Sequence, residues 1–184
     1  MENINILESQ LRQIFATVAW THKIQEKQCD LYIIRSRRLE FLRILASAIT
    51  SSGVFAVIFI DGMWLKLLTA LISAVSLFIT TYFKTYDLNQ LHAQHKEAAL
   101  NFLELREEIT SILCDIKVER YTYYELLQKR DEILEKKIRY SKNTPDATEK
   151  AVKLASKALK VREDNTFSDY EIDSFLPKEA RKNK

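Results

Sequence analysis

Glycine and proline form most turns in proteins, yet this chain of 184 residues contains only two of each. Average usage would give a chain of this length about 22 of them. Dinucleotide-binding loops and P-loops need glycines at fixed spacing, and neither pattern can be written here. Sandwiches and barrels of short strands need a turn roughly every 8–12 residues, so they are excluded as well. The sequence therefore predicts an all-α protein with few turns.

Two stretches, residues 44–60 and 67–83, contain no charged side chain, although the mean hydropathy of the whole chain is only −0.20. As a helix, each stretch is about 25 Å long and approaches the bilayer core of about 30 Å. Neighbouring apolar residues extend the two spans to about 42–60 and 63–83. A short turn with an interfacial tryptophan joins them, which predicts a transmembrane hairpin at residues 44–83. The alternative is a buried hairpin in a soluble protein.

The flanks of the spans predict an orientation. Lysine and arginine outnumber the acidic residues over positions 23–43, whereas the tip of the hairpin offers only Lys66. Positive charge is retained on the cytoplasmic side, so we expect both termini to be cytoplasmic. The net charge of +3 is too small to indicate a nucleic-acid-binding protein.

Regular apolar spacing continues outside the membrane. Residues 4–18 have apolar side chains three and four positions apart, and so do residues 88–116, which is typical of helices packed on one another. The second seam includes His95, Phe102, Leu105, Ile109, Ile112 and Ile116. The two seams can pair as an antiparallel bundle within one chain or between subunits, and the sequence does not choose.

The chain divides into four predicted parts. Residues 1–43 form an N-terminal cytoplasmic helix, residues 44–83 the hairpin, and residues 84–140 one long cytoplasmic helix. Because residues 63–144 lack glycine and proline, the second span is expected to continue unbroken into that helix. Residues 141–184 form a basic amphipathic helix and a tail, with Thr144 as N-cap and Pro145 at the first helical position. The basic face contacts anionic lipid or solvent.

The spans contain two further patterns. Hydroxyl side chains recur on one face of the second span, where they join helices to each other or line a water path. These side chains are Thr69, Ser73, Ser76 and Thr80. The first span has a ridge of small residues suited to close helix packing, namely Ala48, Ser52 and Ala56. One hairpin cannot enclose a pore, so conduction requires a ring of several copies.

No catalytic motif is present, and we expect neither an enzyme nor a bound metal or cofactor. His92 and His95 lie three positions apart on a predicted helix, a spacing that can hold a metal ion. No third histidine and no cysteine is close to them in sequence, so a polar residue that fixes helix register is the favoured role for His95. A metal enzyme is the alternative.

Five segments resemble a known family when they are taken in order. They are residues 20–28 (WTHKIQEKQ), 35–40 (RSRRLE), 82–87 (YFKTYD), 95–99 (HKEAA) and 102–109 (FLELREEI). With the two spans between them, they resemble the SLATT family, two-transmembrane effector domains associated with SMODS nucleotidyltransferases and SLOG sensors in prokaryotic defence. The resemblance covers about residues 10–140, and the tail after Tyr140 lies outside it.

The resemblance implies a non-catalytic effector of an antiphage system in the inner membrane, one that oligomerises and permeabilises the bilayer on an infection signal. Its expected partners are the lipid bilayer, further copies of the chain, and a sensor or nucleotidyltransferase. A cyclic nucleotide signal is compatible with such a partner, although no motif in the chain supports it. The alternative is a non-conducting membrane anchor that recruits a partner through its cytoplasmic helices.

Overall fold

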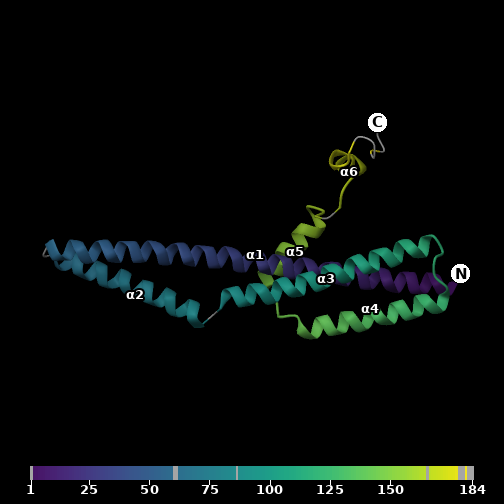
Figure 1. Cartoon of the computed structure of the whole chain (residues 1–184), viewed down its shortest axis with the longest axis horizontal. Helices are drawn as coiled ribbons and strands as arrows, with labels where there is room; N and C mark the ends of the chain where they lie inside the picture. The colour runs from purple at the N-terminus through teal and green to yellow at the C-terminus, as the bar shows by residue number, and fades with distance from the viewer. Residues whose placement is uncertain (1, 60–61, 86, 165, 178–180, 182–184) are drawn as a thin grey trace.

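A computed structural model of the chain describes residues 2–59, 62–85, 87–164, 166–177 and 181. Within these ranges every regular element is a helix, as the shortage of turn residues predicts. In Figure 1, α1 extends along most of the molecule, and α2 and α3 return beside it one after the other. The helices are α1 (Glu2–Phe59), α2 (Met63–Thr85), α3 (Leu88–Lys117), α4 (Tyr123–Asn143), α5 (Glu149–Lys160) and α6 (Asp169–Phe175).

The first helix differs from its predicted division at residue 43. Helix α1 runs through that position without interruption, so the cytoplasmic part and the first predicted span belong to one helix. No loop separates the two parts, so the backbone hydrogen bonds of one helix continue from the predicted cytoplasmic part into the first predicted span.

The expectation of an unbroken helix from residue 63 to Asn143 is wrong, and the first break lies directly after α2. Asp87 is the N-cap of α3, and its carboxylate accepts hydrogen bonds from the backbone N–H groups of Asn89 and Gln90 at 3.0 and 2.9 Å. An N-cap residue starts a new helix because it satisfies N–H groups that lack a partner within the helix. Neither glycine nor proline is needed for such a break.

The second break divides the predicted cytoplasmic helix of residues 84–140 into α3 and α4. Helix α3 ends at Lys117, and Glu119 has the left-handed φ of 54° that commonly follows a helix end. Thr122 then starts α4 through a capping box with Glu125, whose carboxylate accepts from the Thr122 N–H at 2.8 Å. The chain turns back here, so that α4 packs antiparallel to α3 (Figure 1).

Thr144 and Pro145 do not begin the C-terminal helix, in contrast to the prediction. Thr144 is the C-cap of α4, and the N-cap of α5 is Thr148, whose side chain accepts from the backbone N–H of Ala151. The residue before a proline favours an extended backbone, which suits the end of α4 as well as the start of a helix. The start of α5 is set instead by its contacts with α1, which are described below.

The hydrophobic core lies where α1, α3 and α4 meet. Its buried side chains are Leu7, Leu11, Ile14 and Val18 from α1, Phe102, Leu105, Ile109 and Ile112 from α3, and Leu126 and Ile133 from α4. Ile116 is partly buried against this cluster. The two apolar seams therefore face each other within one chain in this structure.

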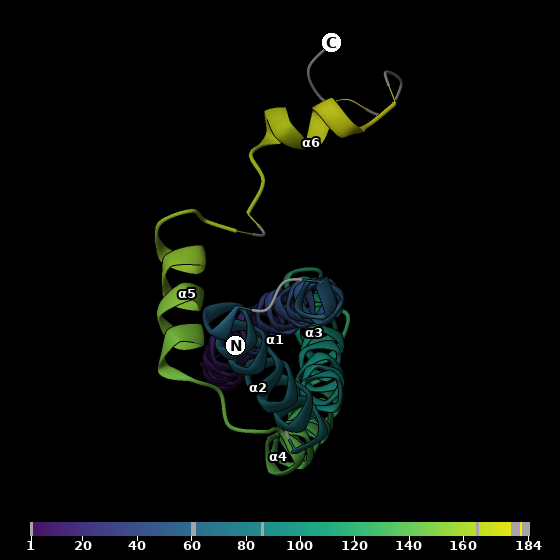
Figure 2. The ribbon, with the colours of Figure 1, turned by 90° about the vertical axis from the view of Figure 1, so that its left-hand side faces the viewer.

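Helix α5 lies outside this three-helix core. Figure 2 shows α5 on the side of α1 that is opposite to α3, with α6 set apart from the other helices. Helix α6 has exposed aromatic side chains, including Phe167 just before it, Tyr170 and Phe175. The rings of Phe167 and Phe175 pack on each other, with their centroids 6.3 Å apart.

We expect Ile109→Ala to lower the free energy of unfolding by about 2–5 kcal/mol, because the side chain is fully buried and its truncation leaves a cavity. Ile138→Ala, at a side chain of α4 that is 55% exposed, serves as the matched control and should change it by less than about 0.5 kcal/mol. Urea unfolding in detergent, followed by circular dichroism, measures both. Equal effects of the two substitutions would contradict this assignment of the core.

Candidate membrane arm and polar junction

Helix α2 has the properties of a membrane span. Residues Met63–Tyr82 have a mean hydropathy of 1.8, and only 6% of this stretch is buried inside the chain. Within the described residues this is one candidate span, where the sequence predicts two. The first predicted span, residues 42–60, ends outside the described part of the chain. We call residues 44–59 of α1 together with α2 the membrane arm.

The two helices of the membrane arm approach each other closely at Gly53. A Cβ atom at this position would lie 2.6 Å from Oγ1 and 3.1 Å from Cγ2 of Thr69. Farther from the tip, Ala46 of α1 and Ile79 of α2 are buried. Since only glycine leaves room for Thr69 without a shift, Gly53 sets the spacing of the two helices near the tip.

The predicted hydroxyl face of α2 lies beside this contact. Thr69, Ser73 and Ser76 are half-buried, and Thr80 is exposed. The hydroxyl groups of Thr69, Ser73 and Thr80 each donate to the carbonyl oxygen four residues earlier, at 2.8–2.9 Å. These three hydroxyl protons are therefore used within α2 and do not join it to α1. The structure thus does not support these three hydroxyls as donors between the helices of one chain.

The predicted ridge of small residues in α1 faces away from α2. Ala48 and Ser52 are exposed, whereas Ala46 is buried and Thr50 is half-buried toward α2. The side chain of Ala56, the third predicted member, lies outside the described residues. Ala48 and Ser52 therefore do not pack against the second helix of their own arm.

A group of buried polar side chains lies between the membrane arm and the hydrophobic core. We call it the polar junction, and it consists of His22, Lys23, Gln25 and Gln28 from α1 and His95 from α3. Among these residues, only His95 is a functional candidate predicted from the sequence. The apolar spacing of α1 continues past Val18 to polar positions such as His22 and Gln25, and this is the signal that could have revealed the others.

His95 connects three segments of the chain through Gln25. Its Nδ1 lies 2.5 Å from Oε1 of Gln25, and Nε2 of Gln25 donates to the carbonyl oxygen of Pro145 at 3.3 Å. Because the amide nitrogen is directed to Pro145, the amide oxygen accepts, and the proton of neutral His95 lies on Nδ1. The ring of Tyr32 lies 5.3 Å from that of His95. This network fixes α1, α3 and the α4–α5 connection relative to one another.

Two further interactions attach the C-terminal segment to α1. Oε1 of Gln28 accepts from the backbone N–H and the hydroxyl group of Thr148, at 2.9 and 2.7 Å. Lys23, whose side chain is only 3% exposed, lies 3.0 Å from Glu26 and 3.6 Å from Asp164. Buried charges need such partners, so the segment that follows α5 completes the environment of Lys23.

Alanine side chains form the face of α5 that contacts α1. Ala151, Ala155 and Ala158 are fully buried, which allows the two backbones to approach closely. At the far end of α5, the ammonium group of Lys160 lies 5.5 Å from the ring centre of Trp20, a cation–π contact. The basic face predicted for this helix is open to solvent, with Lys150, Lys153, Lys157 and Lys160 exposed.

Burial changes the protonation of three groups near the junction. It lowers the pKa of His95, with a smaller contribution from His92, and lowers the pKa of His22, with a smaller contribution from Arg106. Both imidazoles are therefore held in the neutral form. Burial also raises the pKa of the Cys29 thiol to about 11, so this thiol stays protonated at neutral pH.

His92 and His95 are not arranged as a metal site. His95 is bound to Gln25, and the backbone carbonyl of His92 lies 3.8 Å from Sγ of Cys29. Among the described residues, no three side chains of histidine, cysteine, aspartate or glutamate are grouped closely enough to hold a metal ion.

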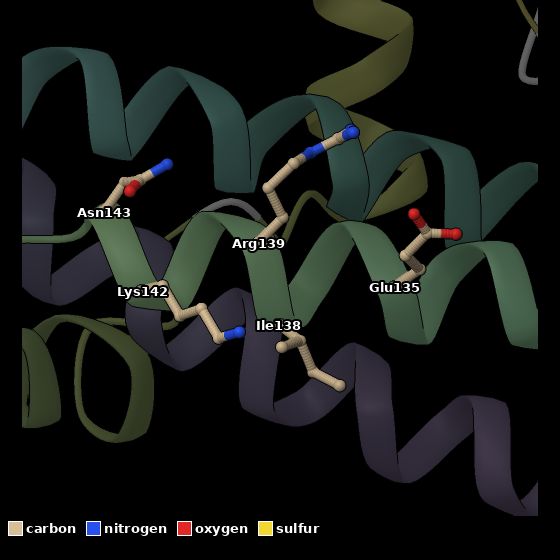
Figure 3. A pocket seen from close by; sticks show the side chains of 5 residues that line it. All are labelled: Glu135, Ile138, Arg139, Lys142 and Asn143. Carbon is tan, nitrogen blue, oxygen red and sulfur yellow. The ribbon is translucent and has the colours of Figure 1, made fainter.

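A shallow hollow on the last turns of α4 has no pattern that indicates a ligand. It has a volume of about 370 Å³. Figure 3 shows Ile138 and Lys142 pointing to one side of α4 and Arg139 to the other. Glu135 lies in the same hollow, so acidic and basic groups are mixed in it.

We expect Gly53→Ala to lower the melting temperature of the chain in detergent, because the new methyl group overlaps Thr69. At an uncrowded position inside a helix, replacement of glycine by alanine stabilises a protein by about 1 kcal/mol. Adding Thr69→Ala removes the overlapping atoms and should restore the melting temperature to the wild-type value or above it. If Gly53→Ala alone stabilises the chain, α1 and α2 are not closely packed at this point.

We expect the chain to lose stability on acidification from pH 7.5 to pH 5.5. The pKa of folded His95 lies below the unfolded value of 6.5, so the unfolded state takes up the proton first as the pH falls through this range. Carboxylates titrate mainly below about pH 4.5 and contribute little here. The melting temperature of His95→Gln should fall less over this interval than that of the wild type. If the melting temperatures of the variant and the wild type fall equally, the titration of groups other than His95 causes the loss of stability.

No curated protein and no solved structure matches the chain. Residues 7–171 match the family model described as "SMODS and SLOG-associating 2TM effector domain family 4". This confirms the resemblance seen in the sequence and extends it beyond residue 140 to include α5 and the beginning of α6. The chain therefore belongs to this family of two-transmembrane effector domains.

Proposed function

We propose that the chain is the membrane effector of a bacterial antiphage system, which assembles in the inner membrane and forms a pore on an upstream signal. Membership of a family of two-transmembrane effector domains supports the membrane and effector parts of this proposal. In it, residues 42–60 and 63–83 are the two spans, and both termini are cytoplasmic. The excess of basic residues over positions 23–43 supports that orientation.

The proposed assembly is supported by a difference between the exposed faces of the two helices of the membrane arm. On α2, large apolar side chains are exposed, among them Leu67, Leu68, Leu71 and Phe78. On α1, Ile44, Leu45 and Ile49 are exposed as well, but a group of small side chains is exposed beside them, namely Ser47, Ala48, Ser51 and Ser52. The hydroxyl groups of Ser51 and Ser52 donate to carbonyl oxygens of their own helix at 3.0 Å. This small-residue face of α1 therefore presents little side-chain bulk, and two of its hydroxyl protons are already used within the helix.

Inside a bilayer these two faces suit different neighbours. Large apolar side chains resemble lipid tails and gain little from contact with another helix, whereas small residues let two helix backbones approach closely. We therefore assign the face of α1 with Ala48 and Ser52 to contacts between copies of the chain. The apolar face of α2 is then left to the lipid. Repetition of such a contact around an axis closes a ring.

The hydroxyl face of α2 is the proposed lining of the pore. Thr69, Ser73, Ser76 and Thr80 follow one side of this helix, next to its contact with α1. A hydroxyl that donates within its own helix keeps a lone pair that can accept from water. A ring in which this side of α2 is turned inward thus gives water and ions a polar path.

Reception of the signal is assigned to the cytoplasmic helices. Because α1 is continuous from the core to the membrane arm, a change in the packing of α3 or α5 on α1 reaches the bilayer without an intervening loop. A sensor or a nucleotidyltransferase of the same defence system is the proposed source of that change. In this proposal, α1 both makes the contacts between copies of the chain and transmits the signal to the membrane arm.

The proposal is tested by the leakage of a small dye from liposomes that contain the purified chain. We expect Ala48→Leu and Ser52→Leu to reduce leakage at least tenfold, because the larger side chains separate neighbouring copies. Thr80→Leu should reduce leakage without changing the mass of the assembly. Ala74→Leu, at an exposed position of α2, is the matched control and should leak like the wild type.

Leakage that is unaffected by all three substitutions would contradict the assigned faces. Absence of leakage at every protein density, together with partner recruitment that depends on Leu105 and Ile109, would show instead that the chain is a non-conducting anchor.

A further inference from the structure

A groove with a mixed apolar and basic lining lies between α1 and the start of α5. Its volume is about 480 Å³, which is within the range of about 300–1,000 Å³ typical of small-molecule sites. The apolar part of its lining consists of Leu31, Tyr32, Ile34 and Leu39. No residue of the membrane arm lines it, so the groove is separate from the pore proposed above.

The charged residues that line the groove are all basic. They are Arg35 and Arg38 from α1 and Lys150 from the first turn of α5, and no carboxylate lines the groove with them. Arg35 donates to the hydroxyl group of Tyr82 at the end of α2. Arg38 and Lys150 form no ion pair within the part of the chain that the structure describes. Three basic residues that line one concave surface, with no acidic residue among its lining, favour a ligand with more than one negative charge.

A buried amide group gives the groove a second feature of a binding site. Gln28 lines the groove but is only 2% exposed, and its Oε1 is occupied by two hydrogen bonds from Thr148. Its Nε2 makes no hydrogen bond within the described part of the chain. This N–H donor is therefore available to a ligand acceptor that enters the groove. The N-terminal end of α5, which is capped by Thr148, adds the partial positive charge of a helix N-terminus.

We infer that this groove binds a ligand that carries phosphate groups. Arginine side chains bind phosphate through two parallel hydrogen bonds, and the apolar lining accommodates an uncharged part of the same molecule. The phosphate can belong to a soluble compound such as a nucleotide or to the headgroup of a lipid. Gln28 precedes the first predicted span, residues 42–60, by about 21 Å of helix, whereas the headgroup layer is only about 6 Å thick. A lipid headgroup therefore reaches only the end of the groove nearest the predicted span, at Arg38, and does not reach Gln28. The geometry thus favours the soluble compound.

The groove is also connected to the membrane arm. Arg35 lines the groove, and its guanidinium group lies 5.3 Å from the ring centre of Tyr82, to whose hydroxyl group it also donates. A phosphate group that binds Arg35 competes with this contact and loosens the end of α2 from α1. This consequence rests on the proposed function, whereas the binding of phosphate does not.

The test is a thermal-shift titration of the full chain in nanodiscs of neutral phosphatidylcholine, with pyrophosphate and adenosine 5′-monophosphate as probes. We expect a saturable rise in melting temperature, since a ligand that binds only the folded state stabilises it. The double variant Arg38→Gln/Lys150→Gln should bind about tenfold more weakly. Lys157→Gln, which removes one positive charge two turns along α5 and outside the groove, is the control and should bind like the wild type. The substituted side chains are exposed, so the unliganded variants should melt together with the wild type.

A second set of nanodiscs with phosphatidylglycerol identifies the source of the phosphate. A rise in melting temperature that needs this lipid and is lost in the double variant supports the groove with a lipid headgroup as ligand. No response to any of the three probes, or an equal loss of binding in Lys157→Gln, would overturn the inference. If the chain binds phosphate but no dye leaks from liposomes, the pore is contradicted and the phosphate-binding groove is supported. If dye leaks but no phosphate binds, the groove is contradicted and the pore is supported.

Discussion

The structure depends on the packing of α3 against one continuous helix, α1. The apolar side chains of both helices follow a spacing of three and four residues, and the hydrophobic core forms where these seams meet. The same helix then continues into the membrane arm. Most helical stability in proteins comes from the packing of an apolar face, so the part of α1 before residue 44 depends on α3, α4 and α5 for its position. This packing also sets the direction in which the membrane arm leaves the core.

The polar junction fixes this arrangement through its most specific contacts. Above and below it the contacts are mainly apolar and tolerate small shifts, but hydrogen bonds between buried groups require specific partners. His95, Gln25 and the carbonyl of Pro145 form one such set, and Gln28 with Thr148 forms another. Both sets include the segment around the start of α5. Displacement of α5 would therefore leave buried polar groups of α1 without partners, which ties the position of α5 to that of α1.

The sequence predicted the features that depend on long patterns. The all-helical class followed from the scarcity of glycine and proline, and membership of the effector family followed from the order of the segments around residues 20–109. Helix boundaries depend on single residues and were less accessible. The breaks at Asp87 and Thr122 come from side-chain caps, and the Thr122-x-x-Glu125 pattern could have indicated the second one. The start of α5 depends on Gln28, a contact across 120 positions that no local pattern contains.

The candidate functional residues also divide into those that a repeated pattern reveals and those that depend on the folded chain. The seam residues from Phe102 to Ile112 are buried, and periodicity is sufficient to find them because burial repeats along a helix. The small residues Ala48 and Ser52 are predicted from their spacing, and the assignment stays a prediction, but the direction in which they face depends on where α2 lies. The role of Gly53 depends on its close approach to Thr69, which no local pattern contains. The basic groove requires α1 and α5 to be adjacent, and this neighbourhood arises only in the folded chain.

In the proposed function, several copies of the chain assemble into a conducting pore whose lining includes the hydroxyl face of α2. Recording of ionic current across a planar lipid bilayer with the purified chain measures this conduction. We expect discrete current steps of uniform size, with smaller steps for Thr80→Leu. If the chain inserts into the bilayer but produces no current steps, at protein densities where its oligomers are present, it does not form a pore.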